Sequence, residues 1–443
     1  MFYLCLYAFY IKQPYLQFLT DTSIKVLWET SEALLGKVQY GFTSDYMFEI
    51  YHYDSTIFHE IEIYPLIKDT LYHYRVISGN DTSPDFTFHT IVSNDRDFRF
   101  IVFGDTRTDS IAHQSVINRI LQTSPEPFFV IQTGDLTQSG SSQEYQTYFN
   151  IEKDLISKTV QYPVLGNHDI PNMTNWFKYF SLPNNERWFT FHFGNSAFHF
   201  LDNYSPDTIG TEQYNWLLNE LLQDSADQDI RHIFIVFHEP PYTTNLGHTS
   251  NLRIRENLVP LFERFNVRIV FNGHNHCYER SFVNGVFYII SGGGGAPLYN
   301  NWGQFEEWTI YREATYEFVI IDVKGDTIIS KGVKPTGEAF DSFTIITSST
   351  GKDEEFQLNE LLFEISSNIL IKDIIVYLNL PERDYIEISV YNIAGEKMGT
   401  LVKSVLDKGM HKFVFTNELL NPGIYYLVLK TSYYNKIKRF VAL

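Results

Sequence analysis

The chain has 443 residues, with 34 basic and 53 acidic side chains and a formal net charge of −19. Its length predicts more than one domain, and its composition of 44% hydrophobic and 20% charged residues is typical of a folded protein. The negative charge argues against nucleic acid as a main partner, because the phosphate backbone would be repelled. No run of the sequence is apolar for long enough to predict a membrane span.

The first residues, 1–12, are apolar and aromatic but have no basic region and no small-residue cleavage site. They fit either the remnant of a signal peptide or a first strand, and we slightly favour the remnant. Cys5 lies here and Cys277 far along the chain, so we expect both cysteines to be free.

Residues 13–95 show short alternating runs separated by turn residues, without a convincing helix. This pattern predicts a β-sandwich, with Trp28 and the pair Tyr72 and Tyr74 in its core. Nothing in this segment suggests chemistry.

Residues 97–345 alternate apolar strands with helical stretches, which predicts a layered α/β domain. Residues 211–222 and 251–265 each carry an apolar stripe at helical spacing. Residues 346–356 form a small polar linker, and residues 357–443 return to strands and turns, which predicts a second, small β-sandwich.

Five buried strands of the central domain end in polar residues. Because ligands bind at the carboxyl ends of strands in open α/β sheets, we expect these residues to share one rim of one sheet. The five motifs are Gly104-Asp105, Gly134-Asp135, Gly166-Asn167-His168-Asp169, His238-Glu239 and Gly273-His274-Asn275-His276. The glycine run 292–295 also follows a strand, but no P-loop lysine follows it, so we interpret it as a permissive turn.

Carboxylates with a few imidazoles suit metal ions such as Mn, Fe and Zn. Two ions held close together need a carboxylate that can bridge them, and we assign this role to Asp135.

In order, the five motifs resemble those of the calcineurin-like metallophosphoesterases. The stretches His238-Glu239-Pro240-Pro241-Tyr242 and His276-Cys277-Tyr278-Glu279-Arg280 resemble the purple acid phosphatases in particular. This resemblance implies a catalytic domain of two sheets flanked by helices. Residues 14–41 resemble the fibronectin type III-like domain that precedes the catalytic part of purple acid phosphatases. Residues 357–443 resemble the C-terminal sorting domains of type IX secreted bacterial proteins, and an autonomous structural module is the alternative.

The resemblance also implies two metal ions, either divalent or trivalent. The first ion would take Asp105, Asp135 and His276, and the second would take Asp135, Asn167, His238 and His274. His168 would lie outside the ligand shell, with Asp169 orienting its ring.

Two positions depart from the family pattern. Gln138 stands where purple acid phosphatases have a tyrosine, and Arg107 stands where the broader superfamily has the histidine of an Asp-x-His motif. The first ion therefore lacks a familiar fourth ligand, which Gln138, His113 or water could supply. We expect a looser first site that holds Mn or Fe(II).

The implied reaction is attack on phosphorus by a metal-bound hydroxide, with His168 protonating the leaving alkoxide. Arg107 is either a clamp on a phosphate oxygen or an ion pair with Asp109 or a neighbouring acid. His248 is either substrate-facing, as the resemblance implies, or merely solvated. We expect His232 to be structural, and the segment Tyr278-Glu279-Arg280 to brace the last loop.

The leading hypothesis is a secreted or surface-exposed hydrolase of phosphate monoesters on small molecules, with possible secretion through the C-terminal domain. The alternatives are a phosphodiesterase or nucleotidase with the same metal centre, and a non-catalytic surface-binding protein on the same scaffold. The motifs specify metals and nucleophile, whereas the leaving group depends on loops such as 243–250 and 292–303.

Overall fold

The computed structural model describes residues 10–347, 362–365, 369–370, 373–380, 382–416 and 420–442. The chain divides into two compact units, Met1–Ser205 with Asp229–Ile346, and Pro206–Gln228 with Thr347–Leu443. Within the described residues, no helix has both the length and the apolar character needed to cross a membrane.

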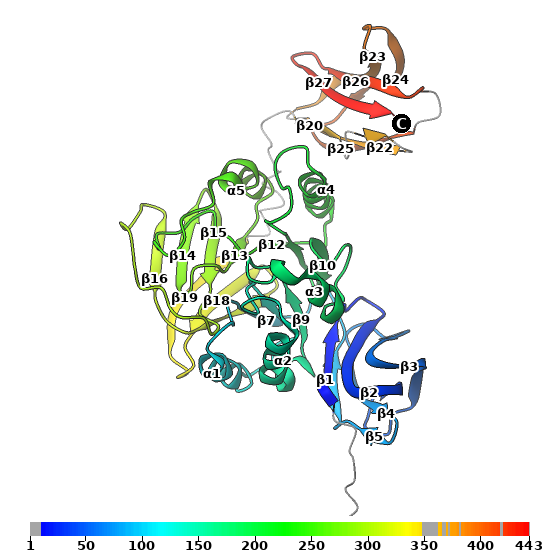
Figure 1. Cartoon of the computed structure of the whole chain (residues 1–443). Helices are drawn as coiled ribbons and strands as arrows, with labels where there is room; N and C mark the ends of the chain where they lie inside the picture. Colours follow the sequence, from blue (N-terminus) through cyan, green and yellow to red (C-terminus); the bar gives the residue numbers. More distant parts are fainter. Residues whose placement is uncertain are drawn as a thin grey trace, which may run out of the picture. The chain divides into compact units, whose positions relative to one another are not determined.

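The N-terminal strands form one hydrogen-bonded sheet, coloured blue in Figure 1. Its long strand β2 pairs with β1 through its first part, with β4 through its last part and with β3 along most of its length. Trp28, Tyr72 and Tyr74 are buried as predicted, whereas a sandwich in this region stays a prediction. The strands are β1 (Tyr10–Gln17), β2 (Ile24–Gly41), β3 (Phe48–Ile63), β4 (Leu71–Ser78), β5 (Asp81–Thr82) and β6 (Phe86–His89). Residues 10–12 of the uncertain N-terminal segment thus belong to β1, and residues 1–9 lie outside the described part.

The α/β domain contains two sheets. One has the order β19-β18-β17-β7-β8-β9 and the other β10-β11-β12-β13-β15-β14-β16. The first consists of β7 (Phe98–Phe103), β8 (Phe129–Gln132), β9 (Val160–Pro163), β17 (Phe318–Lys324), β18 (Thr327–Val333) and β19 (Ala339–Ile346). The second consists of β10 (Phe189–Phe193), β11 (Ser196–Phe200), β12 (His232–Val236), β13 (Ile269–Asn272), β14 (Tyr278–Val283), β15 (Val286–Ser291) and β16 (Thr309–Glu313).

The expectation that all five motifs share one sheet is therefore wrong. β7, β8 and β9 are parallel neighbours in the first sheet, whereas β12 and β13 are parallel neighbours in the second. Buried apolar strands have the same composition in either sheet. Composition indicates that a strand is buried, but it does not indicate which strand it pairs with.

The faces of the two sheets pack on an aromatic core. The ring of Phe100 on β7 lies 5.2 Å from that of Phe198 and 5.4 Å from that of Phe234, both on the second sheet. On the outer face of the first sheet, α1 (Ser110–Ile120) and α2 (Ser142–Ile156) cover Ile101 and Val130. The first sheet is thus covered on both faces, which leaves its strand ends as the place for polar side chains. A short 3₁₀ turn, η1 (Ile170–Asn172), and α3 (Met173–Tyr179) follow β9.

The predicted helix 251–265 is two short helices, α5 (Leu252–Asn257) and α6 (Val259–Arg264). Pro260 lies in the first turn of α6. Because proline has no backbone N–H to donate, it starts a helix readily and cannot continue one.

The N-terminal sheet and the α/β domain share a continuous core and direct hydrogen bonds. The Tyr15 hydroxyl donates to the carbonyl of Tyr179 over 2.7 Å, and the Tyr74 hydroxyl donates to that of Ser157 over 2.5 Å. We infer that the sheet stabilises the loops around α3, which follow the motif at residues 166–169.

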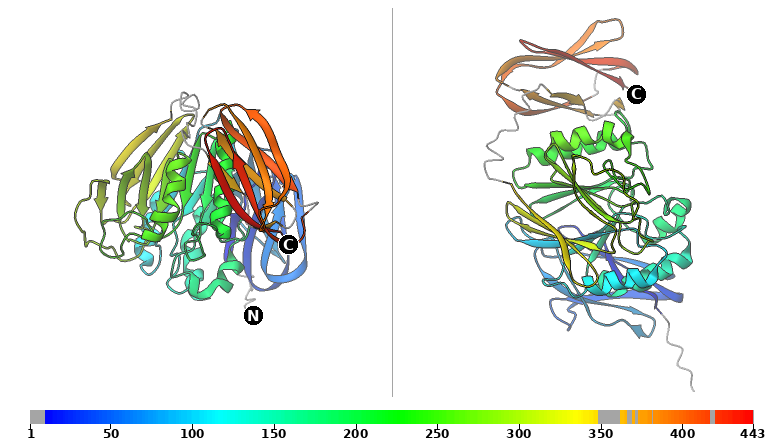
Figure 2. Two further views of the ribbon diagram at one scale, coloured as in Figure 1. Left: turned by 90° about the horizontal axis from the view of Figure 1, so that it is seen from above. Right: turned by 90° about the vertical axis from the view of Figure 1, so that its left-hand side faces the viewer.

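The second unit contains α4 (Glu212–Ala226), where the sequence predicts a helix, and the C-terminal strands. These strands form two sheets around one core, with the orders β20-β22-β25 and β21-β27-β26-β23-β24 (Figure 2). The strands are β20 (Leu362–Ile365), β21 (Ile369–Leu370), β22 (Asp373–Leu380), β23 (Asp384–Asn392), β24 (Lys397–Leu406), β25 (Gly409–Thr416), β26 (Gly423–Lys430) and β27 (Asn435–Ala442). Most of the predicted linker lies outside the described residues.

Candidate metal centre

The first two motifs of the centre come from neighbouring strands of the first sheet. Asp105 and Asp135 each follow a glycine just past β7 and β8, and each has a φ of +54°. Aspartate tolerates this left-handed conformation better than most residues, and the conformation turns the chain sharply at the strand end. The Asp105 backbone N–H donates to the carbonyl of Gly134 over 2.9 Å, so the two loops are joined. Both carboxylates are almost fully buried.

The third motif follows β9 and packs against Asp135. The His168 backbone N–H donates to Asp135 Oδ1 over 3.0 Å. A Cβ on Gly166 would lie 2.1 Å from the same oxygen, so only glycine allows the loop to come this close.

Asp169 plays a different part from the expected one. Its buried carboxylate accepts hydrogen bonds from the backbone N–H groups of Gly166, Leu136 and Thr137. Burial, followed by the charge of Asp135, raises the pKa of Asp169 to about 7. The ring of His168 is instead held through Nδ1 by the carbonyl of Gln138, 2.8 Å away.

Three histidines reach the centre from the second sheet. His238 follows β12 and donates from Nδ1 to the carbonyl of Thr133 over 2.7 Å. His276 contacts the carbonyl of Pro297 through Nδ1, also at 2.7 Å. In both rings this contact leaves the Nε2 lone pair directed away from the backbone, as metal-ligating histidines require.

The glycine run 292–295 supports this geometry. The N–H of Gly294 donates to the carbonyl of Gly104 over 2.9 Å, and that of Ala296 donates to the carbonyl of Asp105 over 2.7 Å. A Cβ on Gly294 would lie 2.3 Å from the Gly104 oxygen. The run therefore packs against the Asp105 loop. Residues 294–296 form a bend and not a turn, so the close approach of the two backbones, and not a permissive turn, accounts for the glycine at position 294.

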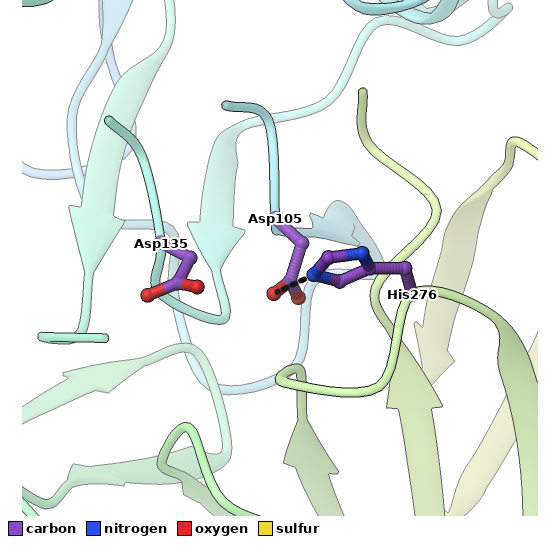
Figure 3. Close-up of side chains that lie close together, drawn as sticks. All are labelled: Asp105, Asp135 and His276. Atoms are coloured by element: carbon purple, nitrogen blue, oxygen red, sulfur yellow. Dashed lines mark ion pairs between the residues drawn. The ribbon is translucent and has the colours of Figure 1, made fainter. Parts of the chain in front are cut away.

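The expected first ligand set is gathered in one place. Donor atoms of Asp105, Asp135 and His276 all lie within 4.8 Å of one another, and all three residues are buried (Figure 3). His276 Nε2 lies 3.7 Å from Asp105 Oδ1. Burial, followed by the charge of Asp135, raises the pKa of Asp105 well above its ordinary value. A positive charge at this place would relieve the repulsion between the two carboxylates.

Three members of the expected second ligand set, Asp135, His238 and His274, lie close together. His238 Nε2 lies 3.4 Å from Asp135 Oδ1 and 3.2 Å from His274 Nδ1. The amide oxygen of Asn167 is buried and has no hydrogen-bond partner among the described residues. Burial, followed by the proximity of His238, lowers the pKa of His274 and keeps that ring neutral. An unpaired buried oxygen fits a ligand of a bound cation, because leaving such an oxygen without a partner is costly.

Arg107 lies inside the first ligand set. Its Nε donates to Asp135 Oδ2 over 3.1 Å, its Nη1 to the amide oxygen of Gln138 over 2.5 Å and its Nη2 to His276 Nε2 over 3.2 Å. Asp109 is not its partner, because that carboxylate caps the N-terminus of α1. The neighbouring acid of the alternative interpretation is Asp135.

The two other proposed fourth ligands are engaged elsewhere or differently. His113 lies on α1 and its Nε2 forms a buried contact of 2.8 Å with Glu152 on α2. Gln138 accepts from Arg107, as described. Neither side chain is available to the first ligand set in this arrangement.

His248 lies beside the centre. Its ring stacks on that of His274 with centroids 3.8 Å apart, and its backbone N–H donates to Asn275 Oδ1. Burial, followed by the charge of His238, lowers the pKa of His248.

Tyr299 and Asn203 were missed by sequence reasoning. The Tyr299 ring stacks on His276 at 4.0 Å, and Asn203 Oδ1 accepts from the backbone N–H groups of His238 and Glu239. Tyr299 falls in the loop 292–303, which the sequence marks only as a candidate specificity segment, and Asn203 belongs to no motif.

The expected structural residues behave as such. Glu279 accepts hydrogen bonds from Thr243 and Thr244, and Arg280 forms an ion pair with Asp341. His232 is buried in β12 and contacts the carbonyl of Gly325. Cys277 is buried and free, as predicted.

Parts of the chain are similar in sequence to known phosphoesterases. Residues 98–278 match the calcineurin-like phosphoesterase family. The chain is 24% identical to a phosphoenolpyruvate phosphatase of Allium cepa over 63% of its length and 28% identical to purple acid phosphatase 21 of Arabidopsis thaliana over 55%. It spans 62% and 60% of these relatives, less than two thirds of each.

The fold resembles that of a purple acid phosphatase from yellow lupin seeds, with a TM-score of 0.66 at 19% identity, over 75% of this chain and 74% of the lupin protein. At 19% identity, this similarity indicates a shared fold. The two-sheet α/β architecture that the family resemblance implies is therefore confirmed.

Proposed function

Because residues 98–278 match the calcineurin-like phosphoesterase family, we propose that this protein hydrolyses phosphoric esters with a bound metal ion. Phosphate monoesters on small molecules are the substrates we favour. The family and its phosphatase relatives support the hydrolase expected from the sequence.

The observation that carries the proposal is the approach of His238 Nε2 to Asp135 Oδ1 and to His274 Nδ1. Asn167, whose buried amide oxygen is unpaired within the described part of the chain, directly precedes His168, whose backbone N–H donates to the same oxygen of Asp135. The residues that would hold the cation are Asp135, Asn167, His238 and His274. When bound, such an ion polarises a phosphoryl oxygen and lowers the pKa of water, and Mn, Fe and Zn all suit a site of mixed oxygen and imidazole donors.

His168 is the residue we assign to the leaving group. The carbonyl of Gln138 accepts from Nδ1 and fixes the ring, while Nε2 points toward the centre, 4.0 Å from Asp135 Oδ2. A proton on Nε2 is thus placed to pass to the departing alkoxide, as a general acid does. Asp169 acts indirectly. Its carboxylate accepts hydrogen bonds from the backbone of the loops that carry Asp135 and His168.

His248 would meet the rest of the substrate. It is half-buried and stacked on His274, so its exposed edge lies at the border of the centre. It lies in the 243–250 loop and is the first candidate for a contact that depends on the leaving group.

A phosphodiesterase or nucleotidase remains the second candidate, because the same donors serve either ester. Hydrolysis of 4-nitrophenyl phosphate and of bis-4-nitrophenyl phosphate, each with Mn, Zn or Fe added, decides between them. Faster turnover of the first supports the monoesterase and faster turnover of the second supports the diesterase. No turnover of either by metal-loaded protein would favour the surface-binding protein.

We further propose that the C-terminal segment, residues 357–443, directs secretion through a type IX system, as its resemblance to sorting domains implies. The experiment is to express the chain with and without residues 357–443 in a bacterium that has this system. Secretion of the full chain and retention of the shorter one support the proposal, and equal distribution contradicts it.

A further inference from the structure

We propose that the guanidinium of Arg107 replaces the first metal ion, so that the centre binds a single cation in the set Asp135, Asn167, His238 and His274. This inference rests on the proposed function and departs from the two-ion centre that the resemblance implies.

The guanidinium contacts the donors that a first ion would need. It donates to Asp135 Oδ2 and to His276 Nε2, which are two of the three members of the expected first set. The Arg107 side chain is only 10% exposed, so its charge is held within the centre and not in solvent. A first metal ion and the guanidinium cannot both occupy this place, because they would compete for Asp135 Oδ2 and for the lone pair of His276 Nε2.

The tautomer of His276 fits a hydrogen-bond donor as its partner. Its Nδ1 contacts the carbonyl oxygen of Pro297, which can only accept, so Nδ1 carries the proton. The single lone pair on Nε2 then faces Nη2 of Arg107 at 3.2 Å. A metal ion would need that same lone pair.

Gln138, which stands in place of the family's tyrosine, also suits a guanidinium better than a metal ion. A tyrosinate would bring a negative oxygen suited to a trivalent ion, whereas the glutamine brings a neutral amide oxygen. That oxygen accepts from Nη1 of Arg107 over 2.5 Å. A neutral acceptor satisfies an arginine donor without adding charge, so the residue at 138 serves the guanidinium.

Asp135 still bridges two positive groups. Its Oδ2 accepts from Arg107, while its Oδ1 lies 3.4 Å from His238 Nε2 in the second set. One carboxylate therefore links the guanidinium to the remaining cation site. Arg107 also supplies the positive charge that the buried pair Asp105 and Asp135 requires.

The experiment is the metal content of the full chain. Protein stripped of metal is loaded with excess Mn²⁺, passed through a desalting column and analysed by mass spectrometry for metal per chain. We expect about one ion in the wild type and in Arg107→Lys, which keeps the charge. We expect about two in Arg107→His, which restores an imidazole at this position.

Electron paramagnetic resonance of the loaded samples gives a second readout. The wild type should show the spectrum of an isolated Mn²⁺ ion, and Arg107→His that of a coupled pair. The matched control is Arg96→His, because Arg96 pairs with Asp69 at the surface, 43% exposed and away from the centre. This control should bind as the wild type does.

Two ions in the wild type, or none, overturn the inference even if Arg107→His fails to fold. The result is separable from the proposed function. If the wild type binds two ions and hydrolyses esters, only the inference is contradicted. If it binds one ion and hydrolyses no ester, only the proposed function is contradicted.

Discussion

Arg107 and Gln138 are the two residues that depart from the pattern of the metallophosphoesterases, and they are hydrogen-bonded to each other over 2.5 Å. The first residue follows β7 and the second follows β8, so the parallel pairing of these strands brings them together. Each departure alone would leave a gap in the centre. Together they form a local arrangement in which an arginine is neutralised by Asp135 and held by an amide.

The pairing predicts that Arg107 and Gln138 are energetically coupled. Gln138→Ala, Arg107→Ala and the double variant should give a coupling energy of about 0.5–1.5 kcal/mol in urea unfolding of metal-free protein, since their shared hydrogen bond is the interaction that both single changes remove. Additive effects would show that the contact contributes nothing. Gln114→Ala on α1 is the control, because its side chain pairs with Asn118.

Asn167→Ala should weaken metal binding. The side chain offers the unpaired buried oxygen of the second ligand set, and loss of one ligand should lower the affinity at least as much as loss of a supporting contact does, on the order of ten- to a hundred-fold. Titration of Mn²⁺ measured by calorimetry checks this. Asn118→Ala, at the exposed face of α1, should bind as the wild type does, and unchanged affinity in Asn167→Ala would remove this residue from the site.

His168→Asn should lower kcat by on the order of 100-fold or more for esters of poorly acidic alcohols, because the proton for the alkoxide is lost. The loss should be much smaller for 4-nitrophenyl phosphate, whose leaving group departs without a proton. Metal content should stay at the wild-type value. Equal losses for alkyl and 4-nitrophenyl esters would contradict the role of general acid.

Glu317 predicts a distinct pH dependence of stability. It is buried between the sheets and accepts from Ser291 and Gly293, and burial raises its pKa to about 8. Between pH 5 and 8 the unfolded chain has lost this proton while the native chain keeps it. The native state therefore binds more protons, and its stability falls as pH rises, by up to about 1.4 kcal/mol per pH unit.

Glu317→Gln keeps the shape and cannot ionise, so its free energy of unfolding should fall less steeply over that window. Urea unfolding at pH 5, 6, 7 and 8 measures the difference from the wild type. Glu306→Gln, at an exposed position, is the control. Parallel profiles for the wild type and Glu317→Gln would show that Glu317 has an ordinary pKa.

Much of the centre could be predicted because each donor directly follows a strand. A buried apolar run marks the strand, and the polar residue after it marks the rim, which is how Asp135, Asn167 and His274 were found. The division into two sheets could not be read from composition, and only the family resemblance implied it. Tyr299 was missed because its stacking on His276 depends on how the 292–303 loop folds.

The partner of Arg107 could not be predicted either. From the sequence, a nearby acid such as Asp109 and a substrate oxygen were both candidate partners of Arg107. In the structure, Asp109 is the N-cap of α1, and its carboxylate accepts hydrogen bonds from the backbone N–H groups of Ile111 and Ala112. Capping and ion pairing compete for the same carboxylate, and which one wins depends on the path of the loop.

The most direct measurement is a crystal structure of the Mn²⁺-loaded protein with the metal located by anomalous scattering. We expect one peak, ligated by Asp135, Asn167, His238 and His274, with the Arg107 guanidinium still bonded to Asp135 and His276. Two peaks with Arg107 turned out of the centre, or no peak among these residues, would contradict this expectation.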